Sequence, residues 1–254
     1  GQALDTRPAS PRGVVTIEVI SGTVRVVGWA RNEVEVKGDS DSPQQFKTEQ
    51  DRTVVRAASA TLEIHVPAAS TVELRGSHVD AHVRDVTGAL RIDTISGDVE
   101  VAGAPASVNA RTASGDVTID GASAQINVHT ISGDIHVRNA RGVAGLETVS
   151  GDCSLAGSTF TQVTMRSTAG GVTFDGQLAP QASFEANAHS GDVTLLLPAS
   201  TNGNFDLRSY HGSIRSLLGS ARAGDTGLAF KAGTGSAIVR ITTFSGDITI
   251  NVRK

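Results

Sequence analysis

Ile92-Asp93-Thr94-Ile95-Ser96-Gly97-Asp98-Val99-Glu100-Val101 is the stretch on which the fold depends, because it returns three more times with small changes. The central Ser-Gly-Asp triplet recurs at residues 114–116, 132–134 and 150–152, so the period is 18 residues. A fixed period near twenty residues is typical of a solenoid, in which each repeat buries its apolar side only by stacking on its neighbours. The sequence therefore predicts a stack of similar coils.

Apolar and polar residues alternate around each triplet. Three apolar columns are shared by the four repeats: Ile92, Ala110, Val128 and Leu146; Val99, Val117, Ile135 and Cys153; Val101, Ile119, Val137 and Leu155. Polar residues between these columns give the period of two that β-strands require. Each repeat is expected to hold two short strands, joined by the Ser-Gly-Asp turn. A second turn, such as residues 103–105, closes the coil.

The series continues in degraded form on both sides of the regular repeats. Triplets follow at Ala169-Gly170-Gly171, Ser190-Gly191-Asp192, His211-Gly212-Ser213 and Ser245-Gly246-Asp247. The last interval is too long for one coil and contains an imperfect turn, Thr234-Gly235-Ser236. Upstream, residues 17–26 have the same order of strand, turn and strand, which indicates an early coil or an opening hairpin. Irregular ends are expected because terminal repeats must cap the stack.

We predict an all-β fold with one solenoid domain. It is a parallel β-solenoid, of the β-helix or β-roll kind, with about 18–21 residues per coil. The predicted boundaries are a flexible segment over residues 1–12, irregular N-terminal coils over 13–75, regular coils over 76–200 and C-terminal capping coils over 201–254.

Composition narrows the possible functions. The net charge is −4 with both signs interspersed, which argues against a nucleic-acid partner. No run of eighteen apolar residues occurs, so no membrane span is predicted in this chain. The single cysteine, Cys153, is expected to point inward and cannot form an intramolecular disulfide. No signal peptide is visible, and a start at Gly1 is what we expect of a mature or trimmed segment.

The turns themselves supply the first candidate site, a turn ladder of stacked Gly-Asp pairs. Its members are Gly97, Asp98, Gly115, Asp116, Gly133, Asp134, Gly151, Asp152, Gly191, Asp192, Gly246 and Asp247. A row of carboxylates attracts calcium, a hard cation. The favoured interpretation is structural, with each Asp accepting hydrogen bonds from nearby backbone amides, because the Gly-x-Asp pattern of calcium-binding β-rolls is absent.

His78, Asp80 and His82 are the second candidate, because strand alternation places them on one face. Two imidazoles and a carboxylate at this spacing can ligate zinc. The competing interpretation is an ordinary outward polar face. No catalytic residue and no cofactor are predicted. A column of Thr94, Thr112, Thr130 and Thr148 is expected to point inward and to exchange hydroxyl hydrogen bonds between coils.

The order of elements resembles a known family. It runs from a strand pair over residues 13–27 through Leu62-Glu63-Ile64-His65-Val66-Pro67 and the repeated triplets to Leu195-Leu196-Leu197-Pro198 and a closing Gly246-Asp247-Ile248-Thr249-Ile250. This order is similar to the bacterial β-strand-repeat family of unknown function that carries the label "putative adhesin". The resemblance implies a parallel β-solenoid exported to the periplasm or cell surface, and it brings no catalytic residues with it.

These observations predict a non-enzymatic, extracytoplasmic binding or scaffold protein of the bacterial envelope, adhesin-like in its elongated β-solenoid surface. The expected partner is a protein or an envelope glycan, and the solenoid ends offer a route to self-association. Two alternatives stay open: a polysaccharide-acting β-helix enzyme, and a β-roll that binds calcium or zinc. Specific function is expected where the repeat is broken, at residues 169–171, 211–213 or 78–84.

Overall fold

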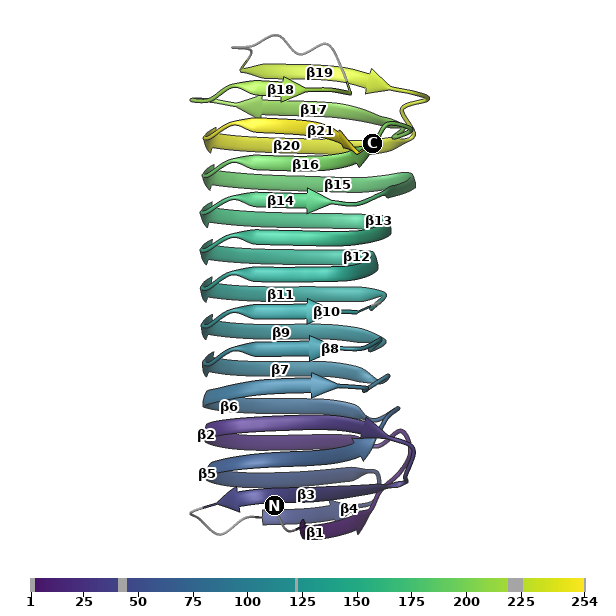
Figure 1. Ribbon diagram of the computed structural model, residues 1–254, viewed down its shortest axis with the longest axis vertical. Helices are drawn as coiled ribbons and strands as arrows, with labels where there is room; N and C mark the ends of the chain where they lie inside the picture. Colours follow the sequence, from purple (N-terminus) through teal and green to yellow (C-terminus); the bar gives the residue numbers. More distant parts are fainter. Residues whose placement is uncertain (1–2, 41–44, 122, 219–225, 254) are drawn as a thin grey trace. The chain divides into compact units, whose positions relative to one another are not determined.

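Figure 1 shows the computed structural model, which describes residues 3–40, 45–121, 123–218 and 226–253. Every regular element in these ranges is a β-strand. The chain separates into two compact units, residues 1–124 and residues 125–254. Most neighbouring strands within each unit run parallel, so the predicted all-β parallel solenoid is confirmed. The predicted domain boundaries remain predictions.

Within residues 3–40, 45–121 and 123–124, the first unit contains ten strands. They are β1 (Ala3–Pro8), β2 (Val14–Trp29), β3 (Glu33–Ser40), β4 (Gln45–Glu49), β5 (Arg52–Pro67), β6 (Thr71–Arg84), β7 (Ala89–Ser96), β8 (Val99–Ala102), β9 (Ser107–Ser114) and β10 (Val117–Asp120). β1 lies in the segment predicted to be flexible, residues 1–12, and it pairs antiparallel with β3.

The second unit contains the remaining strands of the described chain. They are β11 (Gln125–Ser132), β12 (Ile135–Ser150), β13 (Cys153–Ala169), β14 (Val172–Asp175), β15 (Leu178–Ser190), β16 (Val193–Pro198), β17 (Gly203–Ser209), β18 (Ile214–Ser216), β19 (Gly227–Ala232), β20 (Ala237–Ser245) and β21 (Ile248–Arg253).

Stacked coils pair residues that lie one repeat apart. Ile92 of β7 is in register with Ala110 of β9, and Val99 of β8 is in register with Val117 of β10. All four side chains are buried, while intervening residues such as Glu100 face outward. The alternation seen in the sequence therefore divides each strand into a core side and a solvent side.

The spatial order of coils departs from the chain order in both units. In the first unit β2 pairs with β5 on one side and with β6 on the other, although β5 and β6 follow each other in the chain. In the second unit β20 likewise lies between β15 and β17. Residues 17–26 thus belong to a coil and not to a hairpin. The imperfect turn 234–236 connects β19 to β20.

Charge explains part of this order. Glu18 of β2 is in register with Arg56 of β5 and Arg75 of β6, so the inserted strand separates two cations by an anion. Chain order would have placed Arg56 and Arg75 side by side. Opposite charges on neighbouring strands stabilise a sheet and like charges destabilise it. In the second unit the signs are reversed: the cation Arg240 of β20 lies between the anions Glu185 of β15 and Asp206 of β17.

Antiparallel strands cover an edge strand in each unit. β3 and β4 both pair antiparallel with β5, and β19 pairs antiparallel with β17. A parallel stack leaves unpaired backbone groups at its edge, which are a template for aggregation unless another strand covers them. The irregular ends predicted from the sequence therefore include strands that run against the direction of the coils.

The second turn of a coil is not always a break between strands. β12 and β13 continue through it as single strands of 16 and 17 residues. Asn139 and Thr159 lie at these corners with φ of 57° and 47°, in the left-handed region that Asn tolerates better than most residues. The register shifts around Ala140, so the corner bends the strand without ending its pairing.

Candidate functional site

The turn aspartates of the first unit connect neighbouring coils. The backbone amide of Asp98 donates to Oδ1 of Asp80 at 3.0 Å, and the amide of Asp116 donates to Oδ1 of Asp98 at 2.9 Å. Each carboxylate therefore accepts a hydrogen bond from the turn of the adjacent coil, and not from its own turn. Asp80 belongs to this series although its turn reads His78-Val79-Asp80, because His78 is in register with Ser96.

The same ladder runs through the second unit with one interruption. The amide of Asp152 donates to Oδ1 of Asp134 at 2.8 Å, and the amide of Gly171 donates to Oδ1 of Asp152 at 2.7 Å. Gly171 occupies the Asp position of its turn and has no side chain. The amide of Gly171 donates to the ladder, but Gly171 supplies no carboxylate for the coil that contains Asp192.

The ladder continues from Asp192 to Asp247, in the turn between the inserted strands β20 and β21. The amide of Asp247 donates to Oδ1 of Asp192 at 2.8 Å. The carboxylate of Asp247 in turn accepts hydrogen bonds from the amide of Ser213 at 2.8 Å and from its hydroxyl at 2.9 Å. These bonds lower the pKa of Asp247, with a smaller contribution from the positive charge of Arg215. The broken triplet at residues 211–213 is thus the turn that donates hydrogen bonds to the Asp247 carboxylate.

Glycine at the centre of the turn is required by both conformation and space. Gly115 has a φ of 135°, and a Cβ atom added there would lie 2.2 Å from the carbonyl oxygen of Gly97 in the adjacent coil. No L-residue fits such a site without moving the backbone. The Ser-Gly-Asp motif is therefore a packing unit: Gly allows the close approach of two turns, and Asp binds them together.

The proposed metal ligands His78, Asp80 and His82 all belong to β6, and two of them have other partners. Asp80 accepts the ladder hydrogen bond, and Nδ1 of His82 lies 2.8 Å from Oε2 of Glu100. Across residues 3–40, 45–121, 123–218 and 226–253, no group of three or more His, Cys, Asp or Glu side chains is placed to hold a metal ion. Zinc at His78, Asp80 and His82, and calcium along the ladder, remain predictions.

The threonine column is buried, but its hydroxyls act differently from the expectation. Thr94 and Thr112 donate to the carbonyl oxygens of Ser96 and Ser114, at 2.8 and 3.1 Å. Thr148 donates to the carbonyl of Gly133 in the adjacent turn at 3.2 Å. The hydroxyls of Thr94, Thr112 and Thr148 therefore bind turn carbonyls and not one another, whereas the buried Thr130 hydroxyl has no hydrogen-bond partner among the described residues. A threonine hydroxyl just inside the corner can reach these oxygens because the turn folds back over it.

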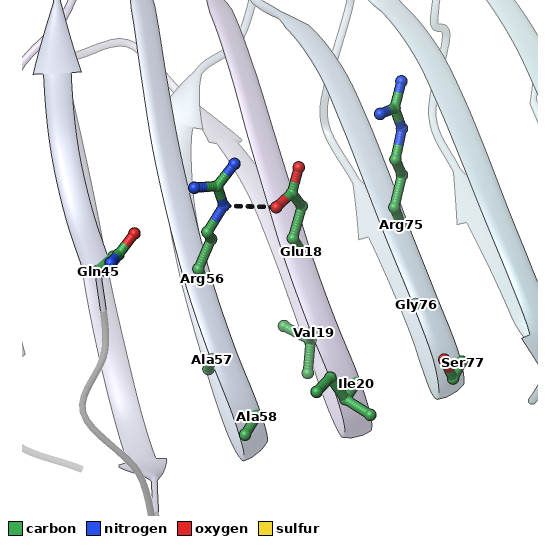
Figure 2. A pocket seen from close by; sticks show the side chains of 10 residues that line it. All are labelled: Glu18, Val19, Ile20, Gln45, Arg56, Ala57, Ala58, Arg75, Gly76 and Ser77. Carbon is green, nitrogen blue, oxygen red and sulfur yellow. Dashed lines mark hydrogen bonds and ion pairs between the residues drawn. The ribbon is translucent and has the colours of Figure 1, made fainter.

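An open depression of about 650 Å³ lies on the outward face of the first unit. Figure 2 shows Arg56, Glu18 and Arg75 on three neighbouring strands, with the ion pair between Arg56 and Glu18 drawn as a dashed line. Ala58, Ile20 and Ser77 lie side by side within β5, β2 and β6, next to the corner of the coil. The depression thus combines a charged row with a less polar row at the corner.

Each unit has such a corner row, and we call the residues of these rows the corner ridge: they face outward and immediately precede the turns. In the first unit it comprises Ala58, Ile20, Ser77, Ile95 and Ala113, and in the second Ile131, Val149, Thr168, His189, Phe244 and Tyr210. Ile20 and Ile95 are 60% and 59% exposed. Apolar side chains that recur at one exposed position of a fold mark an interaction surface.

The ridge of the second unit ends in a cluster of exposed rings, the aromatic corner, formed by His189, Tyr210, His211 and Phe244. The His189 and Phe244 rings stack at 5.0 Å, and His211 contacts Phe244 edge to face at 4.9 Å. Tyr210 lies 6.0 Å from Phe244 at an angle of 35°. Insertion of β20 between β15 and β17 brings these rings together.

Sequence reasoning missed the corner ridge, although a signal was present. Ile95, Ile131 and Val149 are apolar at a position whose parity points outward. With Ala113 in the remaining repeat, an apolar residue stands at this solvent-facing position in all four repeats, which is a departure from the alternation that predicts the strands. The aromatic corner has no comparable signal, because its rings come from segments that are distant in the chain.

The chain belongs to the Toastrack DUF4097 family, whose model matches residues 11–143 and again residues 140–251. No curated protein sequence matches it. Among solved structures it is similar to one described as a putative cell adhesion protein from Clostridium sporogenes, with 10% identity over 99% of this chain and 100% of that one and a TM-score of 0.29. A second, a putative adhesin from Bacteroides fragilis, has 9% identity over 97% and 95% of the two chains and a TM-score of 0.35. No helix in the described ranges is long and apolar enough to cross a membrane.

Proposed function

We propose that this chain is a non-enzymatic binding or scaffold protein of the bacterial envelope that engages its partner through the corner ridge. The supporting observation is the recurrence of exposed apolar side chains at one position of the coil, including Ile20, Ile95 and Ile131. Exposed apolar surface carries a free-energy penalty that binding removes. A repeated exposed position also suits a partner that extends along several coils.

The surroundings of the ridge favour binding over catalysis. In the depression of the first unit, Glu18 already forms an ion pair with Arg56. The Glu18 carboxylate therefore already has a partner on the neighbouring strand β5. The charged rows beside the ridge instead fix the order of strands, as Glu18 does between Arg56 and Arg75. This is the role of a scaffold that presents a surface.

The extracytoplasmic location and the choice between protein and glycan as partner are parts of the same proposal. The order of sequence elements that resembles exported β-solenoids supports the location. Fractionation of the bacterium that produces the protein, with an antibody to this chain, tests it directly. Recovery in the cytoplasmic fraction alone would contradict the proposed location.

The binding role is tested by cosedimentation of the purified chain with envelopes isolated from the producing bacterium. The wild-type chain is expected to sediment with the envelopes, and the double variant Ile131→Ser/Val149→Ser is expected to stay in the supernatant. Both residues are exposed, at 51% and 43%, so the variant should keep the fold.

Asn127→Ser provides the matched control, because Asn127 is an exposed residue of β11 outside the ridge. This variant should sediment like the wild type. Equal sedimentation of the wild type and the ridge variant would show that the ridge is not the binding surface.

A further inference from the structure

The aromatic corner differs from the other aromatic contacts of the second unit. Phe174 contacts Phe160 and Phe184 in the buried core, and the half-buried Phe230 stacks on the buried Phe205. Tyr210 and Phe244, by contrast, are 60% and 45% exposed. The chain has only nine Phe, Trp and Tyr residues, so two large rings at one exposed corner are a considerable share of its aromatic surface.

The arrangement of rings leaves apolar surface available to a ligand. Tyr210 is tilted by 35° relative to Phe244, so the two rings do not cover each other face to face. His189 and His211 support Phe244 by stacking and edge contacts. Rings held in place by their neighbours lose little conformational entropy when a ligand binds.

Planar polar side chains flank the rings on the same outward face. Asn187, Thr242 and Arg208 occupy one row across β15, β20 and β17, two residues before the rings, which is about 6.6 Å along a strand. Arg208 is held by two hydrogen bonds to Asp206, at 3.2 and 3.1 Å. Ordered hydrogen-bonding groups therefore border an apolar platform.

Charges around the aromatic corner nearly balance. Glu185 and Asp206 carry negative charge beside Arg166, Arg240 and Arg208, all on the same outward face. A polyanion or an anionic membrane would need an excess of cations here. The surface suits an uncharged ligand that has both an apolar face and a hydrogen-bonding rim.

We propose that the aromatic corner binds a sugar ring of a neutral glycan. The C–H face of a pyranose would pack on Tyr210 and Phe244, and its equatorial hydroxyls would reach Asn187 and Arg208. Few precisely placed polar groups beside an apolar surface are the usual composition of a small-ligand site. This inference rests on the proposed binding function and names the class of ligand for one part of the ridge.

The test is binding of the purified full chain to an array of neutral oligosaccharides built from glucose, galactose, mannose and N-acetylglucosamine. The wild type is expected to bind at least one of them, and Tyr210→Ala is expected to weaken that binding by about tenfold or more, as for a central aromatic contact. Tyr210→Trp should keep binding, because it preserves the ring. Absence of any bound glycan, or equal binding by Tyr210→Ala, would overturn the proposal.

Two controls isolate the aromatic corner. Asn127→Ser changes an exposed residue of β11 outside the ridge and should leave glycan binding unchanged. Raising the salt concentration should also have no effect, because screening weakens only charge-dependent binding. Envelope cosedimentation is measured separately with the Ile131→Ser/Val149→Ser variant. A wild-type chain that binds no glycan but cosediments more than the Ile131→Ser/Val149→Ser variant would reject this inference alone. A wild-type chain that binds glycan but cosediments no more than that variant would reject the ridge function alone.

Discussion

The amide of Asp247 donates a 2.8 Å hydrogen bond to Oδ1 of Asp192, a residue 55 positions earlier in the chain. The equivalent bond between Asp116 and Asp98 spans 18 positions and measures 2.9 Å. The geometry is the same because the ladder follows the order of coils in space and not along the chain. Substitutions at the turn aspartates therefore report how much the contact between neighbouring coils stabilises the fold.

Removing one carboxylate of the ladder should destabilise the fold. Asp98→Ala leaves the amide of Asp116 without its acceptor, and we expect the free energy of unfolding to fall by about 1 to 2 kcal/mol. Asp98→Asn keeps an oxygen at the same place and should lose less. Chemical denaturation of the three proteins measures the difference. An alanine variant as stable as the wild type would show that water replaces the bond.

Restoring the missing carboxylate should stabilise the fold. A Cβ atom at Gly171 would lie 3.5 Å from the carbonyl oxygen of Asp192, an ordinary contact, so Gly171→Asp fits and can extend the ladder. We expect a gain of about 1 kcal/mol from the hydrogen bond and the reduced entropy of the unfolded chain. Gly170→Ala is the matched contrast, because its Cβ would lie 2.0 Å from the carbonyl of Gly151. Thermal melting should rank the two variants on opposite sides of the wild type.

Reversing the charge of an inserted strand should weaken its pairing. Arg240→Glu places three acidic residues in one row with Glu185 and Asp206. We expect a loss of about 0.5 to 1 kcal/mol that shrinks at high salt, since these side chains are at the surface. Adding Glu185→Arg to Arg240→Glu should recover part of the loss. A double-mutant cycle with no coupling would refute the role of charge in strand order.

The buried thiol of Cys153 should be unreactive in the folded protein. Burial raises its pKa from 9.0 to about 12, with added repulsion from Asp152 and Asp134. At pH 8 iodoacetamide should label it only after denaturation. The raised pKa also contributes stability that is fully present below pH 9 and is lost as the pH rises toward 12. Rapid labelling of native protein at pH 8 would contradict this assignment.

The acid limb of the stability curve should depend on Ser213. Its amide and hydroxyl lower the pKa of Asp247, so the stabilisation is present above the ordinary carboxyl value and is lost as the pH falls through the lowered pKa. Ser213→Ala removes the hydroxyl bond and should raise the Asp247 pKa toward its ordinary value. An NMR titration of Asp247 in both proteins provides the measurement, and identical titration curves would count against the hydroxyl contribution.

The repeating part of the fold was predictable because its determinants are local. The coil is predicted directly from the sequence by the period of the triplets and by the apolar columns of Ile92 and Val99. Strand order at the ends was not predictable in the same way. β2 and β20 pair with partners on both sides that lie far along the chain, and only complementary charges such as Glu18 between two arginines record this order.

The candidate sites were predictable to different degrees. The triplet predicted that Asp98 and Asp116 lie at the turns. That each carboxylate accepts from the adjacent coil became visible only in the structure, because it depends on the distance between coils. The aromatic corner was beyond sequence reasoning, because Phe244 meets His189 only through the insertion of β20. Chemistry that arises from non-sequential neighbours has no period to reveal it.

The position of β20 also determines when the second unit can be completed. Residues 237–253 are the last described segment of the chain, yet they form an interior layer with coils on both sides. During synthesis, the coil of β17 and β18 must therefore wait for β20 and β21 before it can dock. Truncation before residue 237 would remove an inner layer and leave two unmatched faces, so the unit is completed only after both strands are present.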